Sequence, residues 1–216
     1  MDWHGYGAVQ NALTTYIEHH GVKGQKWGVR RYQNKDGTLT TEGKEKAYYR
    51  QRANRIARTT NAVNSIYKTL SNDQKALFGA SPDEIKKQIP YIYDNRQNLN
   101  IAKRFIAKDK NGKPASFLDI WDDKNPSVGQ IAIATRKDLQ GKGYSKEVVN
   151  KAINWFNGNQ NKKMGELQWN AFERNKASLA IAKRYGFTEQ DRLHWEEYKD
   201  DDYIFTSIFK KINESL

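Results

Sequence analysis

A short loop with two glycines and two nearby lysines is the first candidate for chemistry. The loop, Gln140-Gly-Lys-Gly-Tyr-Ser145, follows an apolar run at 128–135 and precedes residues with helical spacing. The first N–H groups of a helix lack partners within the helix, and the positive end of the helix dipole points to the same place. The glycines allow close backbone approach, and Lys142 and Lys146 add positive charge. This pattern favours a pyrophosphate ligand.

Metal and thiol chemistry are not indicated. The chain has no cysteine, which excludes disulfides, thiolate metal sites and a cysteine nucleophile. Of its 4 histidines, His4, His19 and His20 precede residue 21, and no third ligand type stands at metal-site spacing. We therefore expect no metal. We also expect no signal peptide or membrane span, because no long apolar run follows a basic N-terminal region.

Around the loop, residues 71–216 alternate between helix-like and strand-like patterns. Ser71 and Ser81 are typical helix N-caps and predict two short helices. Further elements are predicted along the rest of the chain: strands at 101–108, 115–121 and 128–135, a helix from about 145 to 158, a strand at 166–171, a helix at 175–185, and strands near 188–199 and 203–210. A single mixed α/β domain would hold these elements.

Positive charge is concentrated before residue 71. The chain has 37 Lys and Arg against 25 Asp and Glu, a net charge of +12. Residues 1–70 hold 12 of the basic and 5 of the acidic residues, a net charge of +7, and residues 71–216 hold the remaining +5. Such an excess favours anionic partners such as phosphates or nucleic acid.

The first 70 residues are expected to form an extension of the domain. Residues 1–40 are rich in glycine and aromatic residues and resemble a basic arm, with a turn at 34–37; residues 41–70 predict one basic, weakly amphipathic helix or linker. The stretch at 17–49 resembles a short segment that recurs in proteins of tailed phages and prophages of Gram-positive bacteria. Two roles stay open. In the first, the arm would bind nucleic acid, with Lys26, Arg30 and Arg31 on phosphates and Trp27 and Tyr32 stacked on bases. In the second, it would dock on another protein such as a virion component.

Two motifs in residues 71–216 resemble those of the GNAT family of acetyl-CoA-dependent N-acetyltransferases. The family's Q/R-x-x-G-x-G/A signature appears as Gln140-Gly141-Lys142-Gly143-Tyr144-Ser145, with serine at the last small position. The later pattern N-x-x-A-x-x-L-Y-x-x-x-G-F appears at the same spacing in Asn175, Ser178, Ile181, Ala182, Gly186 and Phe187. The resemblance implies a mixed, mostly antiparallel sheet with flanking helices and a central pair of strands that splay apart.

The resemblance also implies how acetyl-CoA, the co-substrate, would bind. The amides of residues 141–145, directly after Gln140, would hold the pyrophosphate. Backbone groups of Ile133 and Thr135 would pair with the pantetheine arm, and Asn175 would help to line the cleft. The reaction would be direct attack of a neutral amine on the thioester, with an amide polarising the carbonyl.

Two positions depart from the usual catalytic groups of the family. The tyrosine that commonly protonates the departing thiolate falls on Ala182. The position that often supplies a carboxylate base falls on Gly129, with Gln130 beside it. A general acid or base typically contributes about 10²–10⁴-fold. The loss of both groups would slow catalysis or shift the work to other residues.

Several residues are candidates for that work. Tyr185 lies three residues beyond Ala182 on the same predicted helix, and its structural alternative is a core aromatic. Asp119, or Asp122, would act as a base from the second strand, and the alternative is a solvated strand-edge carboxylate. Tyr198 and Tyr203 flank the acidic turn at 199–202 and would face the acceptor groove.

Two functions are consistent with these observations. The first is an N-acetyltransferase, phage- or prophage-encoded, whose acceptor is a protein lysine or N-terminus, a small amine or an aminoacyl-RNA; the net positive charge favours an anionic acceptor. The second is a non-catalytic protein of GNAT-like fold that acts as a virion component or binds nucleic acid, with Ala182 and Gly129 as its main support. Either would be cytoplasmic in a bacterial host cell or associated with a virion.

Overall fold

The computed structural model describes residues 32–78, 81–91, 100–122, 125–158, 163–196 and 201–210. The chain divides into two units, Met1–Tyr48 and Tyr49–Leu216, and the boundary falls within helix α2 (Thr41–Ala57). No helix in the described ranges is long and apolar enough to cross a membrane.

The first unit contains the turn predicted at 34–37. The Gly37 N–H donates to the carbonyl of Asn34 at 3.0 Å, and Gln33 and Leu39 form an antiparallel bridge. Gly37 has a φ of 84°, a left-handed conformation that favours glycine. The predicted nucleic-acid contacts of Lys26, Trp27, Arg30 and Arg31 lie outside the described residues, as do all three N-terminal histidines. Tyr32 is described: the ammonium group of Lys46 donates to its hydroxyl and lies 4.0 Å from the centre of its ring.

The single helix predicted for 41–70 is wrong, because the chain forms two helices, α2 and α3 (Thr60–Tyr67). The backbone N–H of Thr59 donates to the carbonyl of Ile56 at 3.0 Å, and its hydroxyl donates to the same carbonyl at 2.8 Å. Arg104, distant in the sequence, donates to this carbonyl as well, at 3.2 Å. These bonds end α2 at Ala57 and let the chain turn into α3.

Two short helices follow, as Ser71 and Ser81 predicted. Helices α4 (Asn72–Ala76) and α5 (Pro82–Lys86) each begin with a capping box, in which the serine side chain accepts from the N–H three residues later. In turn, the side chains of Gln74 and Glu84 accept hydrogen bonds from the backbone N–H groups of Ser71 and Ser81. The caps satisfy N–H groups that lack partners in the first turn.

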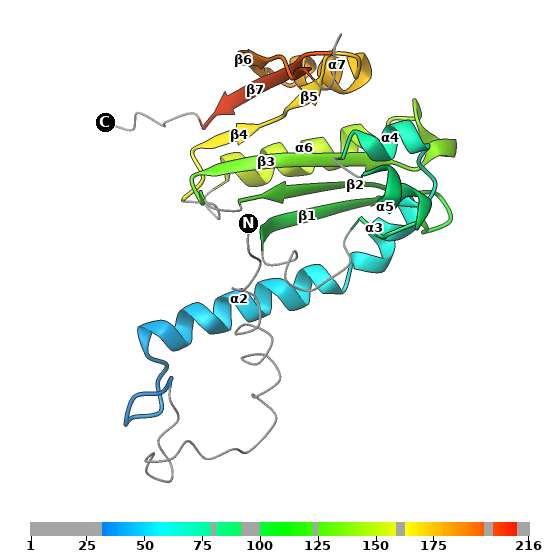
Figure 1. The fold of residues 1–216 in the computed structure, drawn as a ribbon. Coiled ribbons are helices and arrows are strands. Elements are labelled where there is room, and N and C mark those ends of the chain that lie inside the picture. Colours follow the sequence, from blue (N-terminus) through cyan, green and yellow to red (C-terminus); the bar gives the residue numbers. More distant parts are fainter. Residues whose placement is uncertain are drawn as a thin grey trace. The chain divides into compact units, whose positions relative to one another are not determined.

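The second unit is built on a seven-stranded sheet with the order β1-β2-β3-β4-β7-β5, and β6 pairs with β7 (Figure 1). The strands have these bounds: β1 Ile101–Lys108, β2 Pro114–Trp121, β3 Val128–Thr135, β4 Glu166–Gln168, β5 Ala171–Phe172, β6 Thr188–Leu193 and β7 Tyr203–Phe209. All pairs are antiparallel except β3 and β4, which are parallel. The predicted fold class, a mixed and mostly antiparallel sheet with flanking helices, is confirmed.

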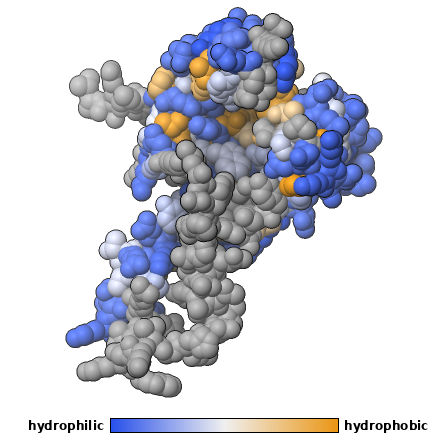
Figure 2. All heavy atoms as spheres, in the orientation of Figure 1, coloured by the Kyte–Doolittle hydropathy of each residue, from blue (hydrophilic) through white to orange (hydrophobic). Residues whose placement is uncertain are grey.

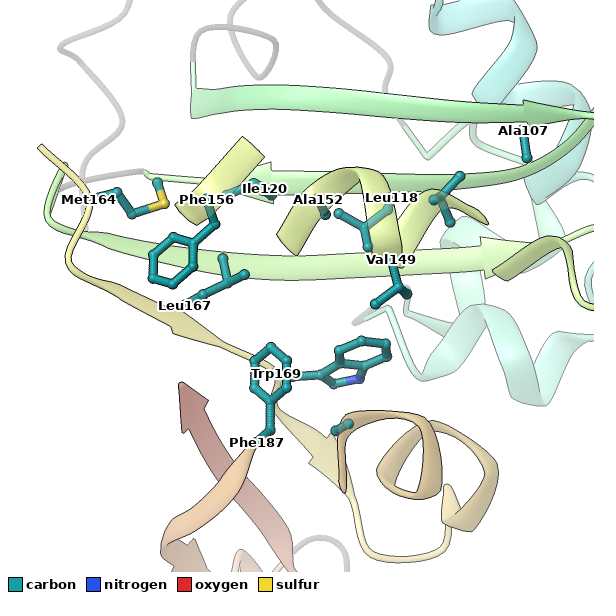
Figure 3. Packing of buried hydrophobic residues seen from close by; sticks show 12 residues of the cluster. Ala107, Leu118, Ile120, Val149, Ala152, Phe156, Met164, Leu167, Trp169 and Phe187 are labelled. Atoms are coloured by element: carbon teal, nitrogen blue, oxygen red, sulfur yellow. The ribbon is translucent and has the colours of Figure 1, made fainter. Parts of the chain in front are cut away.

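Helices cover both faces of the sheet. Helix α6 (Tyr144–Asn157) packs on β1, β2 and β3, and Leu118, Phe156 and Leu167 are part of the core on that side (Figure 3). On the other face, α3 packs on β2 and β3, and its Val63 and Ile66 share a second core with strand residues. Helix α7 (Lys176–Arg184) follows β5. The hydrophobic packing therefore begins before residue 71, where the predicted domain starts.

A buried ion pair joins the sheet to α2. Both guanidinium nitrogens Nε and Nη2 of Arg104 donate to the carboxylate of Asp119, at 2.6 and 2.7 Å, and the two side chains are 2% and 0% exposed. Arg104 also donates to the carbonyl of Ile56. Burial raises the pKa of Asp119, and the hydrogen bonds and charge of Arg104 oppose that shift. One arginine thus connects two strands with the end of a helix.

Replacing Asp119 with alanine would leave the Arg104 guanidinium buried without its carboxylate. Breaking a buried pair in this way costs about 3–5 kcal/mol, and we expect the free energy of unfolding in urea to fall by about that amount. The control is Glu147→Ala, which removes an exposed pair with Lys151 at 2.6 Å and should cost less than about 1 kcal/mol. Similar losses for both variants would contradict this account.

Candidate functional site

The site begins where β3 and β4 stop pairing. Their parallel register runs through the pairs Val128 with Glu166, Gly129 with Leu167 and Gln130 with Gln168, and then ends. Beyond this point β3 continues to Thr135, still paired with β2 on its other side. Residues 131–135 therefore present one edge of β3 that β4 does not cover.

The peptide groups on that edge belong to alternate residues. The N–H of Arg136 donates to the carbonyl of Ala115 on β2 at 2.8 Å. Because peptide groups alternate along a strand, those of Ile131, Ile133 and Thr135 point away from β2, toward the uncovered side. The Gln140 side chain donates to the Thr135 carbonyl at 3.2 Å. The predicted pair of backbone positions, Ile133 and Thr135, lies on this edge.

A local break in the neighbouring strand keeps the edge open. A continuous strand was predicted at 166–171, but β4 ends at Gln168 and β5 begins at Ala171. In the interval the hydroxyl of Thr206 donates to the carbonyl of Trp169, and the Thr206 N–H donates to the side chain of Asn170 at 3.2 Å. The chain thus stays bonded to β7 beyond the end of β4, while its pairing with β3 has ended.

The glycine loop follows β3 directly. After a short 3₁₀ turn, η2 (Lys137–Leu139), Gly141 and Gly143 adopt φ values of 76° and 86°, which favour glycine. Gly143 is the N-cap of α6, and no side chain caps this helix. The first amides of α6 therefore stay available to an anion, together with the positive end of the helix dipole.

Hydrogen bonds from other elements hold the loop in place. Arg136 donates to the carboxylates of Asp109 and Asp138, at 2.9 and 2.7 Å. The Gln74 side chain donates to that of Gln140 at 3.3 Å, and the N–H of Lys137 donates to the Thr69 hydroxyl at 3.0 Å. The turn after α3 and helix α4 thus position the loop.

Loop and strand edge open into a cavity of about 1000 Å³. In Figure 2, apolar residues in orange lie in the hollow between the upper part of the molecule and the part at the right. Six of the predicted cofactor-binding residues line the cavity: Ile133, Thr135, Gln140, Gly141, Ser145 and Asn175. Lys142, Gly143 and Tyr144 do not line it; Lys142 and Gly143 are exposed, and Tyr144 packs partly against the core of α6.

Asn175 has a structural role at this wall. Its side chain caps α7 by accepting from the N–H of Ser178 at 3.3 Å. The Ser178 hydroxyl in turn accepts from the indole N–H of Trp169 at 2.9 Å. Asn175, Ser178 and Trp169 all line the cavity, so this chain of bonds fixes the wall between β4 and α7.

Tyr185 points to α6 instead of the cavity. Its hydroxyl donates to the side chain of Asn150 at 2.9 Å, and its ring packs partly against the core. Burial raises the pKa of Tyr185. Tyr185 is not among the residues that line the cavity, in agreement with its alternative interpretation as a core aromatic.

Asp119 does not reach the cavity either. It is fully buried beneath α2 and α3 and bound by Arg104, so its alternative description as a solvated strand-edge residue is wrong as well. Asp122 is bound by Arg52, with one of the two bonds at 3.0 Å. The sequence does not reveal these ion pairs, because the arginine partners lie 15 and 70 residues away along the chain.

Of the two tyrosines that flank the acidic turn, only Tyr203 is among the residues that the structure describes. Tyr198 lies outside the described residues. Tyr203 lines the cavity, and burial raises the pKa of its phenol. The phenol is therefore protonated at neutral pH.

The two positions that depart from the family pattern face the core. A Cβ at Gly129 would lie 2.5 Å from the sulfur of Met164 and 2.7 Å from Ile120, so no side chain fits there. Ala182 is 1% exposed and belongs to the core of α6. Gln130, next to Gly129, is exposed and lines the cavity.

Aromatic walls are the feature that sequence reasoning missed, apart from Tyr203. Eight aromatic residues line the cavity: Tyr67, Phe78, Tyr91, Trp121, Trp169, Phe172, Trp195 and Tyr203. They come from α3, the segments around α4 and α5, β2, the end of β4, β5 and the β6–β7 region, and only the folded sheet brings them together. The motifs that drew attention in the sequence are glycine-rich and short, and they carry no information about these walls.

Charged groups are sparse in the cavity. Of the described residues that line it, Glu84 alone carries a formal charge, and no Lys or Arg is among them. Glu84 is half-buried and accepts from the N–H of Ser81 at 2.8 Å. Within the described ranges no group of three or more acidic or histidine side chains could hold a metal ion.

Comparison with known families and proteins identifies the central part of the chain. A family model described as an acetyltransferase (GNAT) domain matches residues 67–188. A second model, for a family of unknown function (DUF7211), matches residues 10–34, within the arm and overlapping the segment at 17–49. No curated protein matches the chain.

Solved acetyltransferase structures share the fold. A GNAT-family acetyltransferase from Streptococcus pneumoniae is 16% identical with a TM-score of 0.53, over 69% of this chain and 93% of that one. A spermidine N-acetyltransferase SpeG chimera from Vibrio cholerae and hSSAT is 16% identical with a TM-score of 0.51, over 70% and 91%. A ribosomal-protein-S5-alanine acetyltransferase from Vibrio fischeri is 24% identical with a TM-score of 0.45, over 52% of this chain and 63% of that chain, less than two thirds of its length.

The bond from Trp169 to Ser178 provides a test of the cavity wall. Ser178→Ala would leave the indole N–H of Trp169, which is 1% exposed, without an acceptor, and an unsatisfied buried donor costs about 1–3 kcal/mol. We expect thermal unfolding to report a loss of that size. Ser65→Ala, at an exposed serine of α3, should change stability by less than about 0.5 kcal/mol. A loss of the same small size for Ser178→Ala would show that the bond does not form.

Proposed function

The chain belongs to the GNAT family of acetyltransferases, and from that premise we propose that it transfers the acetyl group of acetyl-CoA to the nitrogen of an amine. The observation that carries the proposal is the uncovered edge of β3 at 131–135, which runs from the glycine loop into the cavity. An extended chain with amide groups would bind such an edge as an added strand. The phosphates would sit on the loop that follows it.

Each part of the site has a role in this proposal. The amides at the start of α6, with Gly141 and Ser145 on the cavity side, would hold the pyrophosphate. Peptide groups of Ile131 and Ile133 would pair with the pantetheine arm. Gln140 keeps the loop against Thr135, and Asn175 keeps α7 in place beside the cavity. Lys142 and Lys146, both exposed, would add positive charge around the phosphates.

The reaction is a direct transfer. The neutral amine attacks the thioester carbonyl, a carbon–nitrogen bond forms, the carbon–sulfur bond breaks, and one proton passes from the amine nitrogen to the thiolate. A backbone N–H of β3 would polarise the carbonyl oxygen. The chain supplies position and a cavity with aromatic and uncharged polar walls, and no covalent intermediate on the protein is required.

Two hydroxyl groups of the cavity walls are candidates for the proton donor. Ser178 accepts from Trp169, so its own hydroxyl hydrogen is directed elsewhere. The Tyr203 phenol is protonated at neutral pH because burial raises its pKa. Tyr185 and Asp119 are engaged by Asn150 and Arg104 away from the cavity, and we assign them no chemical step.

A phage or prophage origin remains a separate proposal. It rests on the resemblance of residues 17–49 to a segment that recurs in phage proteins. The genes that flank the coding sequence provide its test, since a neighbourhood without phage genes would contradict it. Association with a virion or with nucleic acid through the arm depends on the same resemblance and on the net charge of +7 in residues 1–70.

A charge placed in the first turn of α6 tests acetyl-CoA binding. Ser145→Asp would put a carboxylate on the cavity wall beside the expected phosphates, and repulsion should weaken acetyl-CoA binding by about tenfold or more. The fold should not suffer, because an acid is favourable near a helix N-terminus. Ser145→Asn has nearly the same shape without the charge and should bind within about threefold of the parent. Isothermal titration measures both, and equal affinities would contradict the site.

Loop geometry gives a second test with a matched control. Gly141 and Gly112 have φ values of 76° and 75°, and a Cβ would meet nothing within 4 Å at either. Alanine at such a position costs about 1–2 kcal/mol, so both variants should lose similar stability in urea. Only Gly141→Ala should also weaken acetyl-CoA binding, because Gly112 lies in the β1–β2 hairpin. A loss of binding in both variants would point to a general effect on the fold.

A further inference from the structure

The position of the acetyl group within the cavity follows from the strand edge, and this step rests on the proposed function. The glycine loop lies at the Thr135 end of β3, and the pairing with β4 resumes at Gln130. Thr135 lies four residues beyond Ile131 along the strand, which is about 13 Å at the usual rise. With phosphates on the loop, the thioester would lie toward Gln130 and the break at Trp169 and Asn170.

Aromatic rings from two sides surround that end. Trp121 stands opposite Gln130 in the β2–β3 register, and its ring centre is 6.2 Å from that of Tyr91. On the other side Trp195 stacks on Tyr203 at 5.1 Å, and Phe172 meets Tyr203 edge to face at 5.0 Å. The acceptor must therefore approach the thioester between aromatic surfaces.

Charged groups in the lining of the cavity are few. Glu84, on α5, is the one formally charged side chain among the described residues of the lining. A polyanionic acceptor would need several cations, and a polyamine would need several carboxylates; the described walls offer neither. The face of an aromatic ring attracts a single ammonium group, and the ring surface binds apolar groups. The expectation that the net charge of +12 favours an anionic acceptor does not extend to these walls.

We propose that the acceptor is a monoamine whose amino group is attached to an aromatic or other bulky apolar group. The ring of the acceptor would lie between Trp195 and Tyr203 on one side and Tyr91 and Trp121 on the other. Glu84 would supply the single negative charge that draws the ammonium form into the cavity. The ammonium group releases its proton to solvent water, and the neutral amine then attacks.

Probes of different charge test the proposal on the full chain. Acetyl-CoA binding is first measured by titration calorimetry without an acceptor, since a failure at this stage overturns the proposed function itself. Release of CoA thiol is then followed with 2-phenylethylamine, spermidine and O-phosphoethanolamine. We expect kcat/KM for 2-phenylethylamine to exceed that of either other amine by at least about tenfold. With acetyl-CoA bound, preference for either other amine, or no turnover of 2-phenylethylamine, overturns the acceptor inference and leaves acetyl-CoA binding intact.

Matched variants locate the acceptor. Trp195→Leu should raise the KM for 2-phenylethylamine by about tenfold and leave the Kd for acetyl-CoA unchanged. Trp155→Leu makes the same change on α6, where the ring meets Phe105 away from the cavity, and should leave KM unchanged. Equal effects of the two would overturn the assignment.

Glu84→Gln separates the charge from the fold. Glutamine keeps the capping box with Ser81, so α5 should persist while the negative charge is lost. We expect a several-fold rise in KM for 2-phenylethylamine with an unchanged Kd for acetyl-CoA. An unchanged KM would overturn the role of Glu84.

Discussion

The hydrogen bond from the Thr206 hydroxyl to the carbonyl of Trp169 is the interaction on which the site depends. Together with the bond from the Thr206 N–H to Asn170, it satisfies polar groups that a regular β4 would have offered to its neighbours. At this point β4 has ended, β3 keeps an uncovered edge, and the cavity opens. The glycine loop, the edge of β3 and the aromatic walls all line one cavity, which opens where β3 and β4 separate.

Around this opening the rest of the domain has two hydrophobic cores. One core packs α6 on the sheet, and the other packs α3 on the opposite face. The arginines of two buried ion pairs, Arg104 with Asp119 and Arg52 with Asp122, also donate to the backbone carbonyls of Ile56 and Ile101. These bonds tie α2 to β1 and β2. The glycine loop is held by Thr69, in the turn after α3, and by Gln74 of α4.

The sequence predicted correctly those helices and strands whose ends are determined by neighbouring residues. β3 matches its predicted range because an apolar run ends at a charged glycine loop, and α4 and α5 begin at the serines that cap them. The failures involve distant partners. The break between α2 and α3 involves Arg104, and the end of β4 involves Thr206.

The candidate site divides in the same way. The glycine loop is visible in the sequence because its backbone conformation requires particular residues. The walls are not, because an aromatic residue in a strand or turn looks the same whether it faces a core or a cavity. Asp119 illustrates the limit: only its arginine partner distinguishes a structural acid from a catalytic one.

The close packing of Gly129 against Met164 has a consequence for oxidative damage. Met164 is one of 2 methionines in a chain without cysteine, so its thioether is the main sulfur that an oxidant could modify inside the fold. Its sulfur fills the space that a side chain on β3 would need. Conversion to the sulfoxide would add a polar oxygen to this buried side chain, beside Gly129, one residue before the last pair of β3 with β4. Peroxide would then damage the site from the core side, by displacing a strand and not by attacking a reactive group.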